Sequence, residues 1–173
     1  TVRTNAVSLL APGARQVILG DPGSGKSTLL RFLALAGNNA QIRQRFGTPK
    51  DDRLPVLVVL RRYADELKSR PRLDLLEFIL DSVSHDLGLA EAERGSLKEF
   101  YEYYLLAGQA LLLFDGADEL PGPEFKKTVR QRIAGMLRRY PGNSTVVTSR
   151  IVGYDKEVRY DGLGFQHHRV ARL

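Results

Sequence analysis

Residues 16–36 read QVILGDPGSGKSTLLRFLALA, and this stretch decides the fold. The apolar run QVIL stops at Gly20, as a short buried strand does. From Ser27 onward the apolar residues recur at helical spacing, until Gly37 and two asparagines end the pattern. A strand, a glycine-rich loop and a helix are therefore expected to follow one another near the start of the chain.

The loop between that strand and that helix matches G-x-x-x-x-G-K-[ST] at every fixed position, as GDPGSGKS over residues 20–27. Its glycines allow positive φ angles, so that successive backbone N–H groups can converge on phosphate oxygens. The helix that follows directs its positive N-terminus at the same anion. In such a loop Lys26 supplies a charge to the β- and γ-phosphates, and the Ser27 hydroxyl can ligate Mg²⁺. The sequence therefore predicts a nucleotide-binding loop.

The remainder of the chain alternates between apolar runs and helical patterns. Further strands are expected at residues 54–60, 110–114, 144–148 and 168–173. Further helices are expected where apolar residues repeat at helical spacing, over residues 75–87, 97–105 and 125–140. Strands that are apolar throughout and alternate with helices predict an α/β fold, with a central five-stranded parallel sheet between two layers of helices.

An acidic cluster follows one of the expected central strands. The run LLLF at residues 111–114 leads into Asp115, and Asp118 and Glu119 come shortly after it. Open α/β sheets bind ligands at the carboxyl ends of their strands, so Asp115 is placed to hold Mg²⁺ through water. Asp118 and Glu119 are near enough to orient or deprotonate a water that attacks the γ-phosphate.

A third candidate element is the strand over residues 144–150, which ends in two hydroxyl residues, Thr148 and Ser149, followed by Arg150. If this strand lies beside the strand of the loop, Arg150 points at the γ-phosphate and reports whether it is present. An arginine after a strand is common, so this prediction depends on the loop and the acidic cluster.

The composition indicates one globular domain of ordinary size, with 173 residues that are 43% hydrophobic and 27% charged. There is no cysteine, which excludes a disulfide framework and a thiolate metal site. No apolar run approaches the roughly 18 residues of a membrane span, so we expect a cytoplasmic protein without a membrane segment. The net charge is +6, but the basic residues are scattered and not interleaved with aromatic ones, which makes a nucleic-acid partner the less favoured interpretation.

Four blocks of the sequence together resemble the NACHT domain, a branch of the signal-transducing (STAND) P-loop NTPases that includes NOD-like receptors and bacterial NACHT proteins. They read GDPGSGKSTLLRFLA at 20–34, LPVLVVLRRYA at 54–64, LLLFDGADEL at 111–120 and TVVTSRIVGY at 145–154. The DGxDE form of the acidic block is the specific part of the resemblance. Related ATPases usually place a glutamate directly after the metal-binding aspartate, where this chain has Gly116.

The resemblance implies roles for the candidate residues and the strand order 5-1-4-3-2. Asp115 would hold the water shell of Mg²⁺, together with Ser27. Asp118 and Glu119 would serve hydrolysis, with Glu119 favoured as the base but not separated from Asp118, while Lys26 and Arg150 would contact the γ-phosphate. The nucleotide would be held by Gly20, Asp21, Pro22, Gly23, Ser24, Gly25, Lys26, Ser27 and Thr28.

The function implied by the resemblance is a switch that binds ATP or ADP with Mg²⁺ and hydrolyses ATP weakly. It would control the homo-oligomerisation and signalling of a multidomain protein, of immune or antiphage type, with attached sensor and effector domains. The chain begins at Thr1 and its only methionine is Met136. We therefore expect residues 1–173 to be a single NACHT core excised from a longer protein, without its helical and winged-helix parts.

Two other functions are compatible with the same loop. A small-molecule P-loop kinase would need an arginine-rich lid, for which residues 61–62 and 70–72 offer candidates. A motor ATPase acting on nucleic acid would need a basic surface, for which the helix at residues 125–140 is the only support. The three histidines (His85, His167 and His168) lack metal-ligand spacing and are interpreted as structural or solvated.

Overall fold

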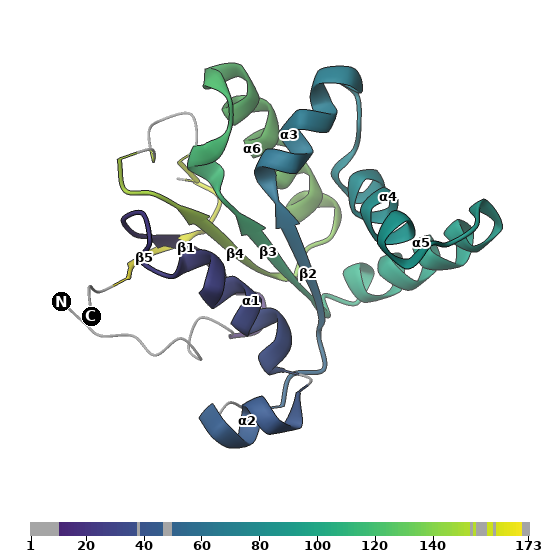
Figure 1. Ribbon diagram of the computed structural model, residues 1–173, viewed down its shortest axis with the longest axis horizontal. Coiled ribbons are helices and arrows are strands. Elements are labelled where there is room, and N and C mark those ends of the chain that lie inside the picture. The colour runs from purple at the N-terminus through teal and green to yellow at the C-terminus, as the bar shows by residue number, and fades with distance from the viewer. Residues whose placement is uncertain are drawn as a thin grey trace.

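The computed structural model describes residues 11–37, 39–46, 50–152, 154, 159–160 and 162–170. Its centre is one five-stranded sheet in which every neighbouring pair is parallel (Figure 1). The strands are β1 (Arg15–Leu19), β2 (Leu54–Val59), β3 (Ala110–Asp115), β4 (Ser144–Ser149) and β5 (Gln166–Arg169). The strand order is β2-β3-β4-β1-β5, which read from the β5 edge is the expected 5-1-4-3-2. The α/β class predicted from the sequence is confirmed.

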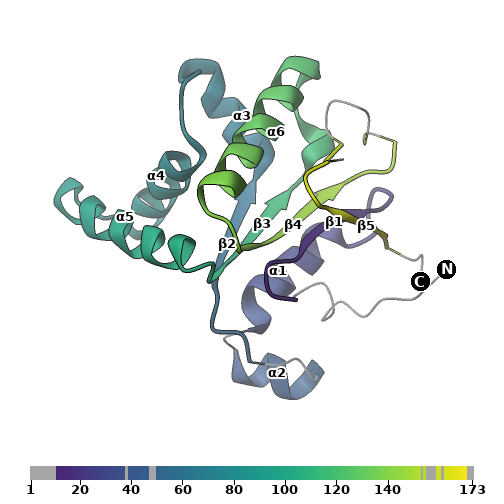
Figure 2. The ribbon, with the colours of Figure 1, turned by 180° about the vertical axis from the view of Figure 1, so that it is seen from behind.

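Helices cover both faces of this sheet. They are α1 (Lys26–Ala36), α2 (Ala40–Phe46), α3 (Leu60–Ser69), α4 (Leu75–Leu87), α5 (Glu91–Leu106) and α6 (Gly122–Arg139), with a 3₁₀ turn η2 at Ala117–Glu119. Helix α1 lies on one face, and α3 and α6 cross the opposite face, as Figures 1 and 2 show from the two sides. Helices α4 and α5 lie beyond the β2 edge. None of the helices in the described residues is long and apolar enough to cross a membrane.

The alternation of side chains along β3 explains why that strand reads as apolar throughout. Leu111 and Leu113 pack with α1 residues in one core cluster, whereas Leu112 and Phe114 belong to the larger cluster beneath α3, α4 and α6. A strand that is buried on both faces has no position left for a polar side chain. Such strands lie in the middle of the sheet. Because neighbouring strands are parallel, their carboxyl ends lie at the same edge of the sheet.

Helix α3 is absent from the sequence prediction, because the apolar run of β2 continues without a break into its first residue. The expected strand at 54–60 ends at Val59, and Leu60 begins the helix. The buried face of α3 is formed by Leu60, Tyr63, Ala64 and Leu67. This helical spacing is present in the sequence, but its first apolar position continues the apolar run of β2, so hydrophobicity alone does not mark where the strand ends and the helix begins.

The last strand also differs from the prediction. It was expected at residues 168–173 but is formed by Gln166–Arg169, and residues 171–173 lie outside the described part of the chain. Strand β5 is at the edge of the sheet and pairs with β1 alone, so most of its side chains are exposed and polar. Because an exposed edge strand needs no apolar run, hydrophobicity placed its start two residues late.

Two further helices differ from the prediction, since α2 was not predicted and α5 begins earlier than expected. Helix α2 was not predicted, although the Asn39 side chain accepts a hydrogen bond from the Ile42 N–H at 3.1 Å, as a residue at a helix start does. Helix α5 begins at Glu91 rather than near Leu97, and the Glu93 carboxylate accepts from the Ala90 N–H at 2.8 Å. These capping interactions mark both starts more clearly than the apolar pattern does.

Candidate nucleotide-binding site

The predicted site residues gather around one cavity at the carboxyl ends of β1, β3 and β4. Its volume is about 280 Å³. It is lined by Pro22, Gly23, Ser24, Gly25, Lys26, Ser27, Thr28, Asp115, Gly116, Asp118, Glu119, Thr148 and Arg150. Gly20 and Asp21 are the two predicted residues that do not line the cavity, and they form the beginning of the loop behind it. The structure therefore brings together residues that lie far apart in the sequence.

The loop from β1 to α1 is shaped by glycines that take positive φ angles. Gly23 has a φ of 74° and Gly25 a φ of 85°, a left-handed conformation that other residues rarely adopt. Gly25 precedes the first turn of α1, which carries neither a side-chain cap nor an acidic residue. The amide groups of that turn are thus left without a side-chain acceptor, and they suit a phosphate group.

Gly20 is required for a different reason, which is space. A Cβ atom at this position would lie 2.5 Å from the Ser24 hydroxyl oxygen. The Gly20 N–H also donates to the Ser149 carbonyl oxygen at 3.2 Å, which joins the start of the loop to the end of β4. A side chain here would therefore disturb both the loop and its contact with the neighbouring strand.

The Lys26 ammonium group lies over its own loop. Its Nζ atom donates to the Gly20 carbonyl oxygen at 2.7 Å and to the Asp21 carbonyl oxygen at 2.9 Å, and it lies 3.4 Å from the Ser24 hydroxyl. These acceptors are neutral, so an anionic phosphate in the cavity would be a stronger partner for the ammonium. The lysine is half-buried and its charge is held at the cavity wall.

The acidic turn begins where β3 ends. Gly116, with a φ of 80°, turns the chain into η2 directly after Asp115. The Thr148 hydroxyl donates to Asp115 Oδ1 at 2.5 Å and accepts from the Gly116 N–H at 3.0 Å. This hydroxyl fixes the orientation of the Asp115 carboxylate toward the cavity.

Thr148 and Gly116 line the cavity, but the sequence assigned neither of them a role, although the hydroxyl of Thr148 was noted at the end of its strand. The signal for Thr148 was the register of the sheet, since Phe114 pairs with Val147 and the following residues on each strand are therefore neighbours. A hydroxyl at the end of β4, next to a carboxylate at the end of β3, is the pattern that would have identified it.

Arg150 lies against the acidic turn. Its backbone N–H donates to Asp118 Oδ1 at 2.8 Å, and its Nε is 3.0 Å from Asp118 Oδ2. Its Nη2 lies 3.7 Å from Glu119 Oε1. The predicted grouping of these three residues at one edge of the sheet is therefore present, but it includes a direct ion pair that the sequence did not indicate.

The oxygen-rich lining suits a magnesium ion. The Ser27 hydroxyl and the Asp115 carboxylate line the same cavity, and both are hard oxygen donors of the kind that Mg²⁺ prefers. The described residues contain no cluster of three or more histidine, cysteine or acidic side chains able to enclose a metal. Mg²⁺ commonly binds through one or two protein groups together with waters and phosphate oxygens, so the two donors fit such an ion.

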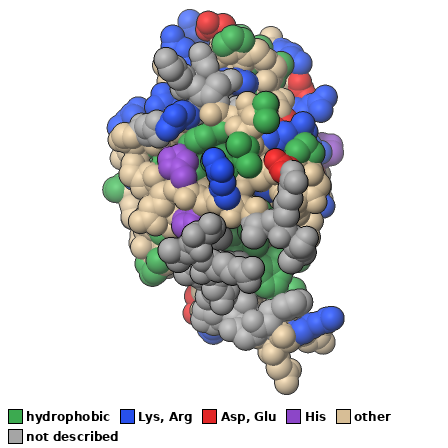
Figure 3. Space-filling model, turned by 90° about the vertical axis from the view of Figure 1, so that its left-hand side faces the viewer, with side chains coloured by type: hydrophobic (Ala, Val, Ile, Leu, Met, Phe, Trp, Pro, Cys, Tyr) green, Lys and Arg blue, Asp and Glu red, His purple; other side chains and the backbone are tan. Residues whose placement is uncertain are grey.

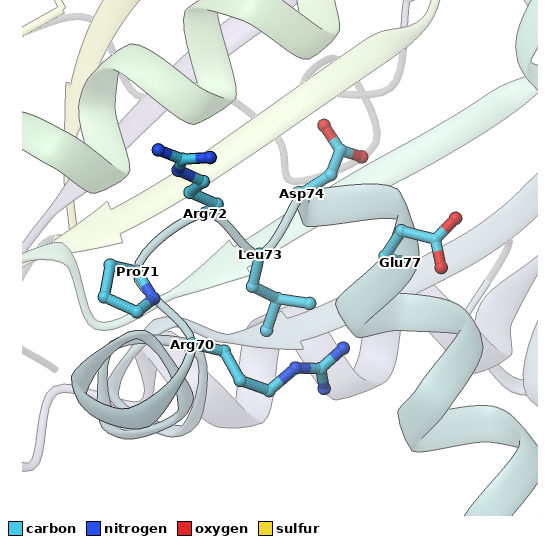
Figure 4. Close-up of a pocket in the computed structure, with 6 residues that line it drawn as sticks. All are labelled: Arg70, Pro71, Arg72, Leu73, Asp74 and Glu77. Carbon is cyan, nitrogen blue, oxygen red and sulfur yellow. The ribbon is translucent and has the colours of Figure 1, made fainter.

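A larger hollow lies away from these residues, between α3 and α4 (Figure 4). Its volume is about 540 Å³, and it is lined by Arg70, Pro71, Arg72, Leu73, Asp74 and Glu77. Arg70 and Arg72 point away from each other, and the Arg70 Nη1 donates to the Asp81 carboxylate at 2.7 Å. The arginines considered as a kinase lid at residues 61–62 lie on α3. None of these side chains lines the nucleotide cavity.

Within the part of the chain that the structure describes, the basic and histidine side chains away from the cavity do not gather into one cluster. On the face shown in Figure 3, lysine and arginine side chains occupy several separate places rather than one stripe. His167 Nε2 lies 2.7 Å from the Tyr154 hydroxyl, and His168 Nε2 lies 2.6 Å from Gln16 Oε1. His85 is exposed on α4 beside Asp86. The three histidines thus have structural or solvated surroundings.

The fold and the site together define the class of P-loop NTPases: a parallel sheet, a G-x-x-x-x-G-K-[ST] loop leading into α1, and a carboxylate at the end of β3 facing the same cavity. Residues 15–168 match the family model of the NACHT domain. The chain belongs to the NACHT family, as its four sequence blocks predict. A search of the curated proteins gave no match.

Proposed function

We propose that this NACHT domain is an ATP-binding and slowly ATP-hydrolysing molecular switch. The observation that supports the proposal best is the convergence of the loop, Asp115, the pair Asp118 and Glu119, and Arg150 on one cavity. Each of these groups has chemistry that a nucleoside triphosphate requires. Only a ligand with several phosphates would use all of them at once.

The chain's own residues would divide the work as follows. The amides at the start of α1 and the Lys26 ammonium bind the β- and γ-phosphates. Ser27 and Asp115 hold Mg²⁺, which when bound neutralises charge on the phosphate oxygens. A carboxylate of the acidic turn orients the attacking water and accepts its proton, and Arg150 contacts the γ-phosphate.

The switch itself would rest on the presence or loss of the γ-phosphate. Loss of that group removes the partner of Lys26 and Arg150 and changes how the ends of β1 and β4 are held. In a longer, cytoplasmic parent protein this change would control homo-oligomerisation and signalling through attached sensor and effector domains. We place that signalling in immune or antiphage defence, by resemblance to the family.

Binding of a fluorescent ATP analogue in the presence of Mg²⁺ tests the proposal. We expect saturable binding by the wild type and a loss of at least about tenfold in Lys26→Ala, because the ammonium contributes a charge-assisted contact. Lys127→Ala removes an exposed lysine of α6 that is remote from the cavity and serves as the matched control. Equal binding by the wild type and Lys26→Ala would contradict a phosphate site at this loop.

A further inference from the structure

Asp118 and Glu119 are neighbours in the sequence, but their surroundings differ sharply. The side chain of Asp118 is only 7% exposed, whereas that of Glu119 is 44% exposed. Both oxygens of Asp118 are engaged by Arg150, one by its backbone N–H at 2.8 Å and the other by its Nε at 3.0 Å. Glu119 approaches the same arginine only at 3.7 Å, beyond hydrogen-bonding distance.

This difference separates the two carboxylates chemically. A general base needs an oxygen that is within reach of a water and is not already engaged by strong donors. Asp118 accepts two N–H groups from Arg150, so both of its carboxylate oxygens are already occupied by donors. Glu119 lines the cavity with an exposed carboxylate, and Arg150 does not approach that carboxylate within hydrogen-bonding distance.

The contacts of Asp118 also determine how Arg150 is presented. They hold the backbone N–H and Nε, which lie on the inner side of the arginine. Among the described residues the terminal nitrogens make no hydrogen bond, and the 3.7 Å approach to Glu119 is their only ion pair. A guanidinium held in this way keeps its outer edge, with two terminal nitrogens, available for a phosphate group.

We propose that Asp118 is a positioning residue that holds Arg150 at the cavity and is not the base. The inference deepens the proposed function and rests on it. It assigns Asp118 to the discrimination of ATP from ADP, because that discrimination depends on where Arg150 is held. Of the two carboxylates of the acidic turn, it leaves the proton transfer to Glu119.

The test compares the affinities of variants for ADP and for a non-hydrolysable ATP analogue, both with Mg²⁺. We expect Arg150→Ala to reduce the preference for the triphosphate by about tenfold, the size of one charge-assisted contact. Asp118→Ala should reduce this preference by a similar factor, and Asp118→Asn by a smaller one. The double variant that combines Asp118→Ala with Arg150→Ala should reduce the preference by no more than Arg150→Ala does. Glu119→Gln should keep the preference and lose ATP turnover. Glu99→Ala, an exposed acid on α5, serves as the control.

Two results would overturn the assignment. In the first, Asp118→Asn keeps the wild-type preference and loses turnover as completely as Glu119→Gln does, which would make Asp118 a base. In the second, thermal unfolding of the two single variants and the double variant shows additive effects, which would mean that Asp118 and Arg150 are not coupled. The unfolding measurement needs no nucleotide, so it tests the coupling of Asp118 and Arg150 separately from the proposed function. If the wild type binds neither nucleotide, both the proposed function and the role of Asp118 in discrimination are wrong.

Discussion

The two ends of the parallel sheet are held by different kinds of contact. At the amino end the polar groups are enclosed and paired with each other, with Asn143 as the clearest case at 2% exposed. At the carboxyl end the two cations Lys26 and Arg150 face a cavity, and their partners are backbone carbonyl oxygens for Lys26 and the carboxylates of the acidic turn for Arg150. A ligand can replace the contacts at the carboxyl end but has no access to those at the amino end. The comparison separates the part of the sheet that maintains the fold from the part that exchanges partners.

Hydrogen bonds and an ion pair connect the segments that begin β1, β2 and β4 at the amino end of the sheet. Arg53, just before β2, pairs with Asp51 and donates to the Ser144 hydroxyl at the start of β4. That hydroxyl also accepts from the Gly13 N–H at 3.0 Å and donates to the Ala11 carbonyl oxygen at 3.1 Å. Three groups that are distant from Ser144 in the sequence thereby meet at its hydroxyl, although none of them is in the predicted site.

The largest effect on stability is expected from Asn143→Ala. The Asn143 side chain accepts from the Ala110 N–H at 2.8 Å and donates to two carbonyl oxygens, of Leu105 at 2.8 Å and Tyr140 at 3.0 Å. Removal leaves three buried backbone groups without this partner, at a cost of about 3 kcal/mol in the free energy of unfolding. Urea unfolding measures the cost, and Gln131→Ala on the exposed face of α6 is the control.

If Asn143→Ala lowers the free energy of unfolding by less than about 1 kcal/mol, the contrast between the two ends of the sheet is wrong. Such a result would mean that the amino end tolerates exchange of its polar contacts as the carboxyl end does.

A pH-dependent effect is expected from Asp51→Asn. Burial raises the pKa of the Asp51 carboxyl, but hydrogen bonds from the Arg53 side chain and backbone N–H outweigh it, so that the pKa lies below the ordinary value of 3.8. A carboxyl with a lowered pKa contributes stability above its unfolded-state pKa, and this contribution is lost as the pH falls through the folded-state pKa. The wild type should therefore exceed Asp51→Asn by about 2 kcal/mol at neutral pH, with the gap closing below about pH 4.

Unfolding free energies measured from neutral to acidic pH test this expectation, with Asp52→Asn as the control. Asp52 is the exposed neighbour of Asp51 and pairs with Lys50 at the surface, a pair worth less than about 1 kcal/mol. A gap for Asp51→Asn that is independent of pH would show that the ion pair is not the source of its effect.

A smaller effect on stability is expected from Thr148→Val at the carboxyl end. It removes the donor to Asp115 and the acceptor of the Gly116 N–H, at a cost of about 1 kcal/mol because both groups are near solvent. Thr148→Ser loses a buried methyl group but retains the hydroxyl, so it should keep both hydrogen bonds. The sharper readout is a Mg²⁺ titration of nucleotide binding, in which Thr148→Val should need more Mg²⁺ for half-saturation.

If Thr148→Val and Thr148→Ser give the same Mg²⁺ dependence, the hydroxyl does not orient Asp115. The orientation of Asp115 would then follow from the backbone pairing of β3 and β4 rather than from this hydroxyl.

The sequence predicted those parts of the fold in which burial leaves a simple pattern. The central strands β3 and β4 and the loop around Lys26 were found because their residue types have few alternatives at those positions. Helix α3 was missed because its apolar face begins inside the run that forms β2, and hydrophobicity alone does not mark the boundary. Strand β5 was placed late because an edge strand with exposed side chains carries no apolar signal.

The site was predictable as a set of residues but not as a set of contacts. Lys26, Asp115 and Arg150 each follow a strand or open a helix, and parallel topology brings such positions to one edge. The pairing of Arg150 with Asp118 depends on the register of β4 beside β3 and on the turn made by η2. The spacing of residues along the sequence determines neither of these. The same holds for Thr148, whose role appears only once its neighbour across the sheet is known.

The position of β1 has a consequence for how the protein is made. Both of its strand neighbours, β4 and β5, follow β2 and β3 in the sequence, so β1 and the loop after it are synthesised well before either of them. The loop therefore leaves the ribosome long before the strands that fix it have been translated, and contacts between such distant segments form slowly. A chain that ends before Ser144 would contain the complete phosphate-binding motif but none of the strands that pair with β1, so the motif would be present without the site.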